Sequence, residues 1–220
     1  MTASLPGDAV EAGHELIAAA DRAGDVHVVS RGRINTASVL NYLGQYESAR
    51  GLLDRVLPDV RNYRLRILEA SCIHNMGMSD ARRGSLDPAI EMQREAAKIA
   101  DECYGVRLAV NCRIYEATML VWRGAPGDLR RAYDLALYVN ERTQSLLGMQ
   151  IIALFCLARV QRARREVPAA LEAAEEAYRR LSDGPVEEWD EQIRLVYIEA
   201  LLASGRNEEA HDALRNAFEA

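Results

Sequence analysis

Gly44–Ala49 reads GQYESA and Gly84–Ala89 reads GSLDPA, so two similar stretches begin 40 residues apart. Each starts with a turn-forming glycine and ends in an alanine. Related stretches follow at 127–132 (GDLRRA), 166–170 (EVPAA) and 205–210 (GRNEEA). Self-similarity at a spacing of about 20 to 50 residues is typical of proteins built from stacked repeats. We therefore expect successive copies of one structural unit along the chain.

The residues that follow each alanine have the spacing of an amphipathic helix. Ala49, Leu53 and Val56, for example, recur at intervals of three and four residues and so share one helix face. Between each such helix and the next stretch there is room for a second helix, and Pro58-Asp59 and Gly105 are expected to end helices. Because a lone helical hairpin cannot bury its apolar face, the hairpins must stack on one another. The predicted fold is all-α: a stack of about five helical hairpins plus an N-terminal helix.

Small residues at fixed places should let the paired helices approach closely. A larger side chain there would overpack the crossing and cost about 1 to 3 kcal/mol. We expect the repeated alanines to lie at these crossings: Ala49, Ala89, Ala132, Ala170 and Ala210.

The segments 35–49 and 75–89 resemble tetratricopeptide (TPR) repeats, and the resemblance covers nearly the whole chain. It implies that the stacked hairpins form a right-handed α-α superhelix. The family's usual repeat is about 34 residues, so a spacing near 40 is more similar to the long-repeat variety of MalT-like regulators and of bacterial kinase and ATPase signalling proteins. Because terminal apolar residues such as Leu16 and Leu214 would lack a polar capping helix, we expect a fragment of a larger protein. The expected organisation is a single TPR-like domain over 1–220, with a half repeat at 8–25 and repeats at approximately 28–60, 62–104, 106–143, 145–182 and 188–219.

Composition limits the classes of partner. The chain has 220 residues, 49% of them hydrophobic, and a net charge of −6, which is enough to fold but is unlike a nucleic-acid-binding protein. No apolar run approaches the roughly 20 residues of a membrane span, and no secretion signal is visible. Lys98 is the only lysine among 27 basic residues, a bias typical of GC-rich bacterial genes. We expect a cytoplasmic bacterial protein that binds neither nucleic acid nor membranes.

No motif indicates catalysis, a metal or a cofactor. The glycines are spaced as hairpin turns and form no phosphate-binding loop. Cys72 and His74 are two residues apart on a predicted helix and would point to different faces, which argues against shared metal ligation. The four cysteines fit reduced thiols of the core. We predict that the protein is not an enzyme and needs no cofactor.

The resemblance implies a concave groove lined by the first helix of each hairpin, which receives a peptide or a partner helix. Asn35 and Asn75 occupy the same repeat position, and an asparagine amide both donates to and accepts from a peptide backbone. Arginines would add sites for carboxylates. The predicted binding residues are Asn35, Ser38, Tyr42, Asn75, Met78, Arg82, Tyr115, Thr118, Arg159 and Arg162, and the same alignment adds Asn41, His74 and Trp122. The alternative interpretation is ordinary solvated surface, or, for Tyr115 and Trp122, packing between hairpins.

The favoured function is a non-enzymatic protein-protein interaction scaffold that binds a peptide or partner helix in this groove. The alternative is a ligand- or peptide-sensing regulatory module of a bacterial kinase, ATPase or transcription regulator. A sensor would have to change curvature when its ligand binds, because a ligand shifts a population only by preferring one state. Self-association through uncapped ends is a third, structural interpretation.

Overall fold

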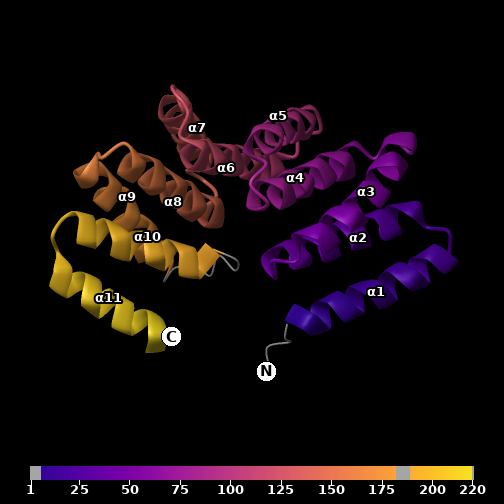
Figure 1. Cartoon of the computed structure of the whole chain (residues 1–220), viewed down its shortest axis with the longest axis horizontal. Coiled ribbons are helices and arrows are strands. Elements are labelled where there is room, and N and C mark those ends of the chain that lie inside the picture. Colours follow the sequence, from indigo (N-terminus) through magenta and orange to yellow (C-terminus); the bar gives the residue numbers. More distant parts are fainter. Residues whose placement is uncertain (1–5, 182–188, 220) are drawn as a thin grey trace. The chain divides into compact units, whose positions relative to one another are not determined.

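The computed structural model describes residues 6–181 and 189–219 (Figure 1). Within these ranges the chain forms eleven α-helices and no β-strand. The prediction of an all-α, TPR-like solenoid of helical hairpins is confirmed. The helices divide into two compact units, residues 1–115 and 116–220, which are described separately.

Unit 1 is a succession of antiparallel helices of equal length joined by three-residue turns. Each of the first five helices has 17 residues. Neighbours in sequence pack against each other, and α2 also contacts α4, the first helix of the following hairpin. The helices are α1 (Pro6–Arg22), α2 (Val26–Tyr42), α3 (Tyr46–Asn62), α4 (Arg66–Arg82), α5 (Leu86–Glu102) and the first part of α6 (Val106–Arg123).

Unit 2 continues from the remainder of α6. In it α8 contacts α7, α9 and α10, and α10 contacts α9 and α11, so hairpins again follow one another. Its further helices are α7 (Asp128–Arg142), α8 (Leu147–Ala163), α9 (Val167–Arg180), α10 (Asp190–Ala203) and α11 (Asn207–Glu219).

The turns of unit 1 share one backbone geometry. At the α2–α3 turn Gly44 has a φ of +76°, and the amide of Gln45 donates to the carbonyl of Leu40 at 2.8 Å. This is the Schellman arrangement, which satisfies carbonyls at a helix end and favours glycine. Arg64 and Tyr104 occupy the same left-handed position, with φ of +53° and +56°. Glycine is thus replaced by large side chains at the α3–α4 and α5–α6 turns.

One expected helix end is wrong. Pro58 lies inside α3, which continues to Asn62. Val56 and Val60 on either side of it are fully buried. Their packing stabilises a last helical turn that the missing amide of proline weakens.

The repeated alanines are buried in every hairpin. Ala49, Ala89 and Ala132 are inaccessible to solvent, and Ala170 and Ala210 are 2% exposed. Around them lie apolar side chains from both helices, such as Leu53, Cys72 and Met76 in the core between α3 and α4.

Candidate functional site

The first helices of unit 1 present matching stripes of residues. Because α2, α4 and α6 begin at positions 26, 66 and 106, a residue of one has its counterpart 40 positions later. Residues three or four apart share a helix face. We name the stripe outside the hairpin cores the first-helix face: His27, Arg31, Asn35, Ser38 and Tyr42 on α2, Ile67, Ser71, Asn75, Met78 and Arg82 on α4, and Arg107, Asn111 and Tyr115 on α6.

Seven of the predicted binding residues belong to this face. Asn35 and Arg82 are exposed, Tyr42 is 63% exposed, and Ser38 and Met78 are half-buried. Contact between α2 and α4 sets their stripes side by side.

Tyr115 and Cys112 of α6 both contact His74 of α4. Tyr115 is half-buried, with its ring centroid 5.2 Å from that of His74 at an interplanar angle of 70°. Cys112 Sγ lies 3.6 Å from His74 Nδ1. Tyr115 therefore lies against α4 at His74, the residue that precedes Asn75.

Asn75 is the middle residue of the stripe on α4 and carries an unsatisfied acceptor. Its side chain is turned into the fold and the residue is only 7% exposed. Its Nδ2 donates to the Ser71 carbonyl at 2.9 Å, whereas its buried Oδ1 accepts no hydrogen bond from the described part of the chain. Buried polar atoms are nearly always hydrogen-bonded, so such an atom indicates a missing donor.

Asn41 and His74 do not belong to the groove, contrary to the alignment. Asn41 is buried and joins the first helices: its Nδ2 donates to the Asn75 carbonyl at 3.1 Å, and its Oδ1 accepts from Ser79 Oγ at 2.7 Å. These bonds hold α2 and α4 in fixed register from inside.

His74 is buried against α5 and α6. Its Nδ1 donates to Gln93 Oε1 at 2.7 Å, and Gln93 Nε2 donates to the His74 carbonyl at 3.0 Å. Burial lowers the pKa of the His74 imidazole, and the bond to Gln93 opposes that shift only in part. His74 therefore belongs to the core, whereas Asn75, which is equally buried, lies at the edge of the first-helix face.

The other three predicted residues lie in unit 2. Thr118 is buried. The guanidinium of Arg159 lies over the Phe155 ring, 5.4 Å from its centroid, and Arg162 pairs with Glu199 on α10 at 2.9 Å. Two of the predicted cations are therefore engaged with neighbouring side chains, and Trp122 is 38% exposed.

Charge is segregated in unit 1. Within 26–115 the first helices carry six arginines and two carboxylates, Glu69 and Asp80, whereas the whole protein is acidic. Both carboxylates are buried and paired: Glu69 with Arg61 at 3.0 Å and Arg66 at 2.6 Å, and Asp80 with Arg50 and Arg83. The first-helix face itself contains no carboxylate.

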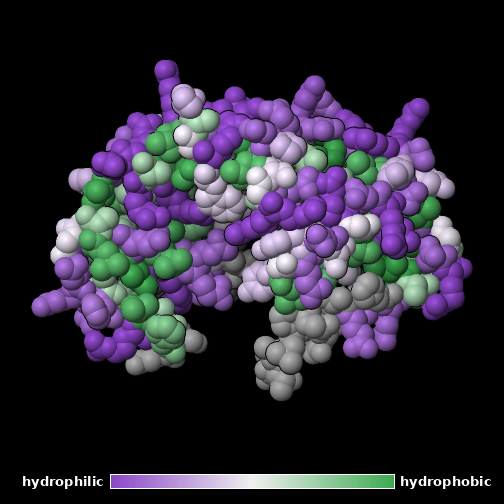
Figure 2. Space-filling view, viewed as in Figure 1, coloured by the Kyte–Doolittle hydropathy of each residue, from purple (hydrophilic) through white to green (hydrophobic). Residues whose placement is uncertain are grey.

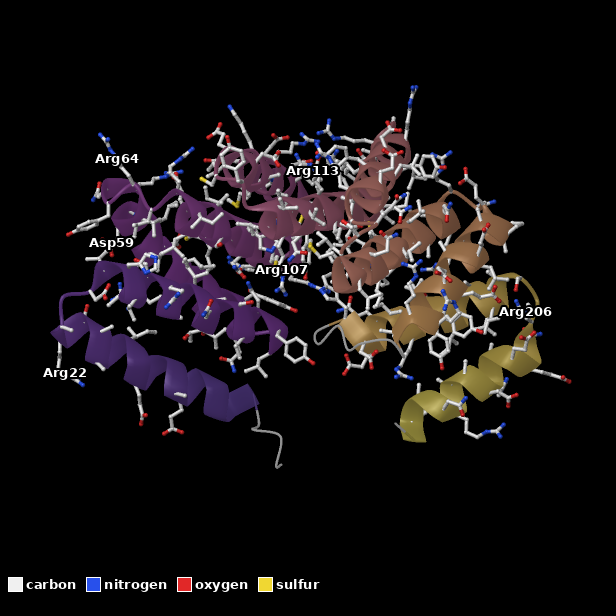
Figure 3. The ribbon with its side chains drawn as sticks, turned by 180° about the vertical axis from the view of Figure 1, so that it is seen from behind. Arg22, Asp59, Arg64, Arg107, Arg113 and Arg206 are labelled. Atoms are coloured by element: carbon white, nitrogen blue, oxygen red, sulfur yellow. The ribbon has the colours of Figure 1, made fainter. Side chains whose placement is uncertain are left out.

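Sequence reasoning missed two cations of this face, Arg31 and Arg107. Both are exposed, and neither forms an ion pair with another described residue. In Figure 3, Arg107 and Arg113 lie on different sides of α6, and Arg113 is paired with Asp101 at 2.5 Å. Both could have been found from the sequence: Arg31 lies one helical turn before Asn35, and Arg107 lies about two turns before Tyr115, the counterpart of Asn35 on α6.

Unit 2 has a different surface at its last hairpin. Figure 2 shows apolar residues gathered over α10 and α11. Leu195 is 55% exposed, although its counterpart on α8, Phe155, is 1% exposed, and Leu214 is 43% exposed against 1% for Ala174 on α9. Leu202 and Phe218 are also exposed, by 51% and 85%. In the preceding hairpin the positions of Leu195 and Leu214 are therefore buried.

The described residues offer neither a metal site nor a membrane span. No group of three or more histidine, cysteine, aspartate or glutamate side chains among them is placed to hold a metal ion. None of their helices is long and apolar enough to cross a membrane.

Solved structures share this architecture. BtubC (BKLC) from P. vanneervenii matches with a TM-score of 0.74 and 15% identity over 99% of this chain and 91% of that one. A putative kinesin light chain with TPR-like repeats from Podosopora anserina matches with a TM-score of 0.61 and 18% identity, over 86% and 93%. At these identities the likeness is one of fold. No family model and no curated protein matches the sequence.

Proposed function

Because the chain folds as a TPR-like domain, we propose that it is a non-enzymatic interaction scaffold that binds an extended peptide across the first-helix face of unit 1. TPR-like folds are generally scaffolds that bind protein partners. A cytoplasmic bacterial signalling protein remains part of this proposal, and its four cysteines, none of which is in a disulfide, fit a reducing compartment.

The observation that carries the proposal is the buried Oδ1 of Asn75. This oxygen is buried in the structure, so the Asn75 side chain would have to rotate to expose it. A backbone N–H of a bound peptide would then supply the hydrogen bond that the oxygen lacks. Asn35, at the same repeat position on α2, is exposed and offers a second amide to the same backbone. The two amides would bind the peptide backbone, and the residues around them would select among peptide side chains.

The test is selection of binders from a phage-displayed library of short random peptides, followed by affinity measurements on variants. Replacing Asn75→Ala together with Asn35→Ala should weaken the selected peptides at least about tenfold, equal to about 1.4 kcal/mol. The matched control is Asn62→Ala, an exposed asparagine on α3 outside the face. Equal binding by the double variant and the wild type would rule out this face as the site.

Self-association is a second candidate, favoured by the exposed apolar side chains of the last hairpin. Leu195 and Leu214 occupy positions that are buried in the preceding hairpin of unit 2. Contiguous exposed apolar residues of this kind mark interaction surfaces. Light scattering over a concentration series should show association that Leu195→Glu abolishes; a monomer at every concentration excludes this candidate.

A further inference from the structure

We propose that the peptide bound at the first-helix face carries acidic and apolar residues in alternation, with its acidic side chains towards Arg31 and Arg107 and its apolar side chains towards Tyr42 and Met78. This inference rests on the proposed function and names the chemistry of its ligand.

The first-helix face has three rows across the helices. The first helices run in the same direction, because one antiparallel helix separates each from the next. The amides of Asn35 and Asn75 form the middle row. Arg31 is four residues before Asn35, about 6 Å along the helix, and Met78 is three residues after Asn75, about 4.5 Å in the other direction. We call the side towards the helix starts, which holds Arg31 and, one turn further, Arg107, the cationic row. We call the side that holds Tyr42 and Met78 the apolar row; it also includes Arg82, at the register position of Tyr42, which already interacts with another group.

The cationic row selects acidic side chains. Arg31 and Arg107 form no ion pair with the described residues, and His27 lies one turn before Arg31. The carboxylates of α2, α4 and the unit 1 part of α6 are already bound by arginines, as Glu69 is by Arg61 and Arg66. Arginine pairs well with carboxylates, and no carboxylate of the described residues neutralises Arg31 or Arg107.

The apolar row selects uncharged side chains. Tyr42 is 63% exposed and its neighbour Leu43 is 38% exposed. Met78 is half-buried, and the flexible thioether of methionine adapts to different apolar partners. No carboxylate of the face lies in this row either, and burial of apolar area would supply the affinity.

The backbone geometry of an extended peptide links the two rows. Successive side chains of a strand point to opposite sides, while its N–H and C=O groups point at right angles to them. A strand whose N–H groups face the asparagine amides would therefore direct alternate side chains to the arginine row and to the Tyr42–Met78 row. The order of residues in the ligand matters as well as its composition.

Three labelled peptides of equal length test this inference: glutamate alternating with leucine, the same residues in two blocks, and glutamine alternating with leucine. Fluorescence anisotropy with the full chain should show at least about tenfold tighter binding of the alternating acidic peptide than of either other peptide, and added salt should reduce the difference from the glutamine peptide. Arg31→Gln with Arg107→Gln should remove that difference. Arg55→Gln, an exposed arginine on α3, is the matched control and should leave it unchanged.

The outcomes separate this inference from the proposed function. Equal binding of the acidic and glutamine peptides, with both lost in Asn75→Ala, overturns the acidic preference and leaves a peptide site. Equal binding of the blocked and alternating acidic peptides overturns the alternation. Failure of the wild type to bind any of the three, while library-selected peptides bind through Asn75, also overturns the inference.

Discussion

Gly77 of α4 lies so close to Ala89 of α5 that a β-carbon on Gly77 would be 3.2 Å from the Ala89 carbonyl oxygen. The same β-carbon would meet Gln93 Nε2 at 2.7 Å and Met92 Cβ at 3.2 Å. Two small residues thus allow the backbones of this hairpin to approach, as the repeated alanines led us to expect. The approach also brings Gln93 within reach of His74.

Replacing Gly77→Ala should lower the free energy of unfolding by about 1 to 3 kcal/mol, because a methyl group would overpack the crossing and displace Gln93. Gly51→Ala is the control, since Gly51 is exposed on α3 with nothing within 4 Å of the added carbon. That change should stabilise the helix by about 0.5 to 1 kcal/mol. Urea unfolding measures both, and a loss of similar size at the two positions would contradict the packing argument.

Arg64→Gly and Tyr104→Gly should each raise stability by about 1 kcal/mol. Both residues adopt positive φ, and a β-carbon in the left-handed region costs about 1 to 2 kcal/mol that glycine avoids. Gly84→Ala tests the reverse direction, because Gly84 has a φ of +90° and open space around it. Thermal unfolding should place the two glycine variants above the wild type and Gly84→Ala below it. Unchanged midpoints for all three would refute the strain.

Ser30→Ala should stabilise unit 1 by about 1 kcal/mol. Ser30 is 1% exposed, and its Oγ has no hydrogen-bond partner in the described structure. Folding therefore removes this hydroxyl from water without compensation, and an alanine would avoid that cost. Its counterpart on α4 is the fully buried Ala70. Ser79→Ala should do the opposite, since Ser79 Oγ donates to the buried Asn41 Oδ1 at 2.7 Å. Denaturant titration that finds Ser30→Ala destabilising would show that the hydroxyl is satisfied.

Stability should fall in mild acid because of His74. Its folded-state pKa is lowered by burial, so below the unfolded histidine pKa, about 6.5, the unfolded chain takes up a proton that the folded chain does not. Above about pH 6.5 the neutral His74 contributes its full share of the unfolding free energy. As the pH falls from there towards the folded-state pKa, that share decreases by up to about 1.4 kcal/mol per pH unit. The difference in unfolding free energy between wild type and His74→Gln should therefore vary with pH below about 6.5. A difference that stays constant from neutral to acid would disprove this origin.

The sequence by itself determined the hairpins, the buried alanines and the common register of Asn35 and Asn75. These features depend on local periodicity and on short turns, and both can be read along a single chain. The direction of neighbouring side chains was decided by packing: His74 turns into contact with Gln93 and Cys112, whereas Asn75 borders the first-helix face. A helix covered on several sides has no single apolar stripe from which this difference can be predicted.

Only the tertiary structure decided that α3 continues through Pro58, that the buried Oδ1 of Asn75 lacks a donor and that the carboxylates of α4 are already paired. Each depends on residues distant in sequence, such as Arg50 and Arg61 on α3, which reach Asp80 and Glu69. Hydrogen-bond satisfaction and net charge at a surface are sums over such neighbours, so they exist only once the helices are packed.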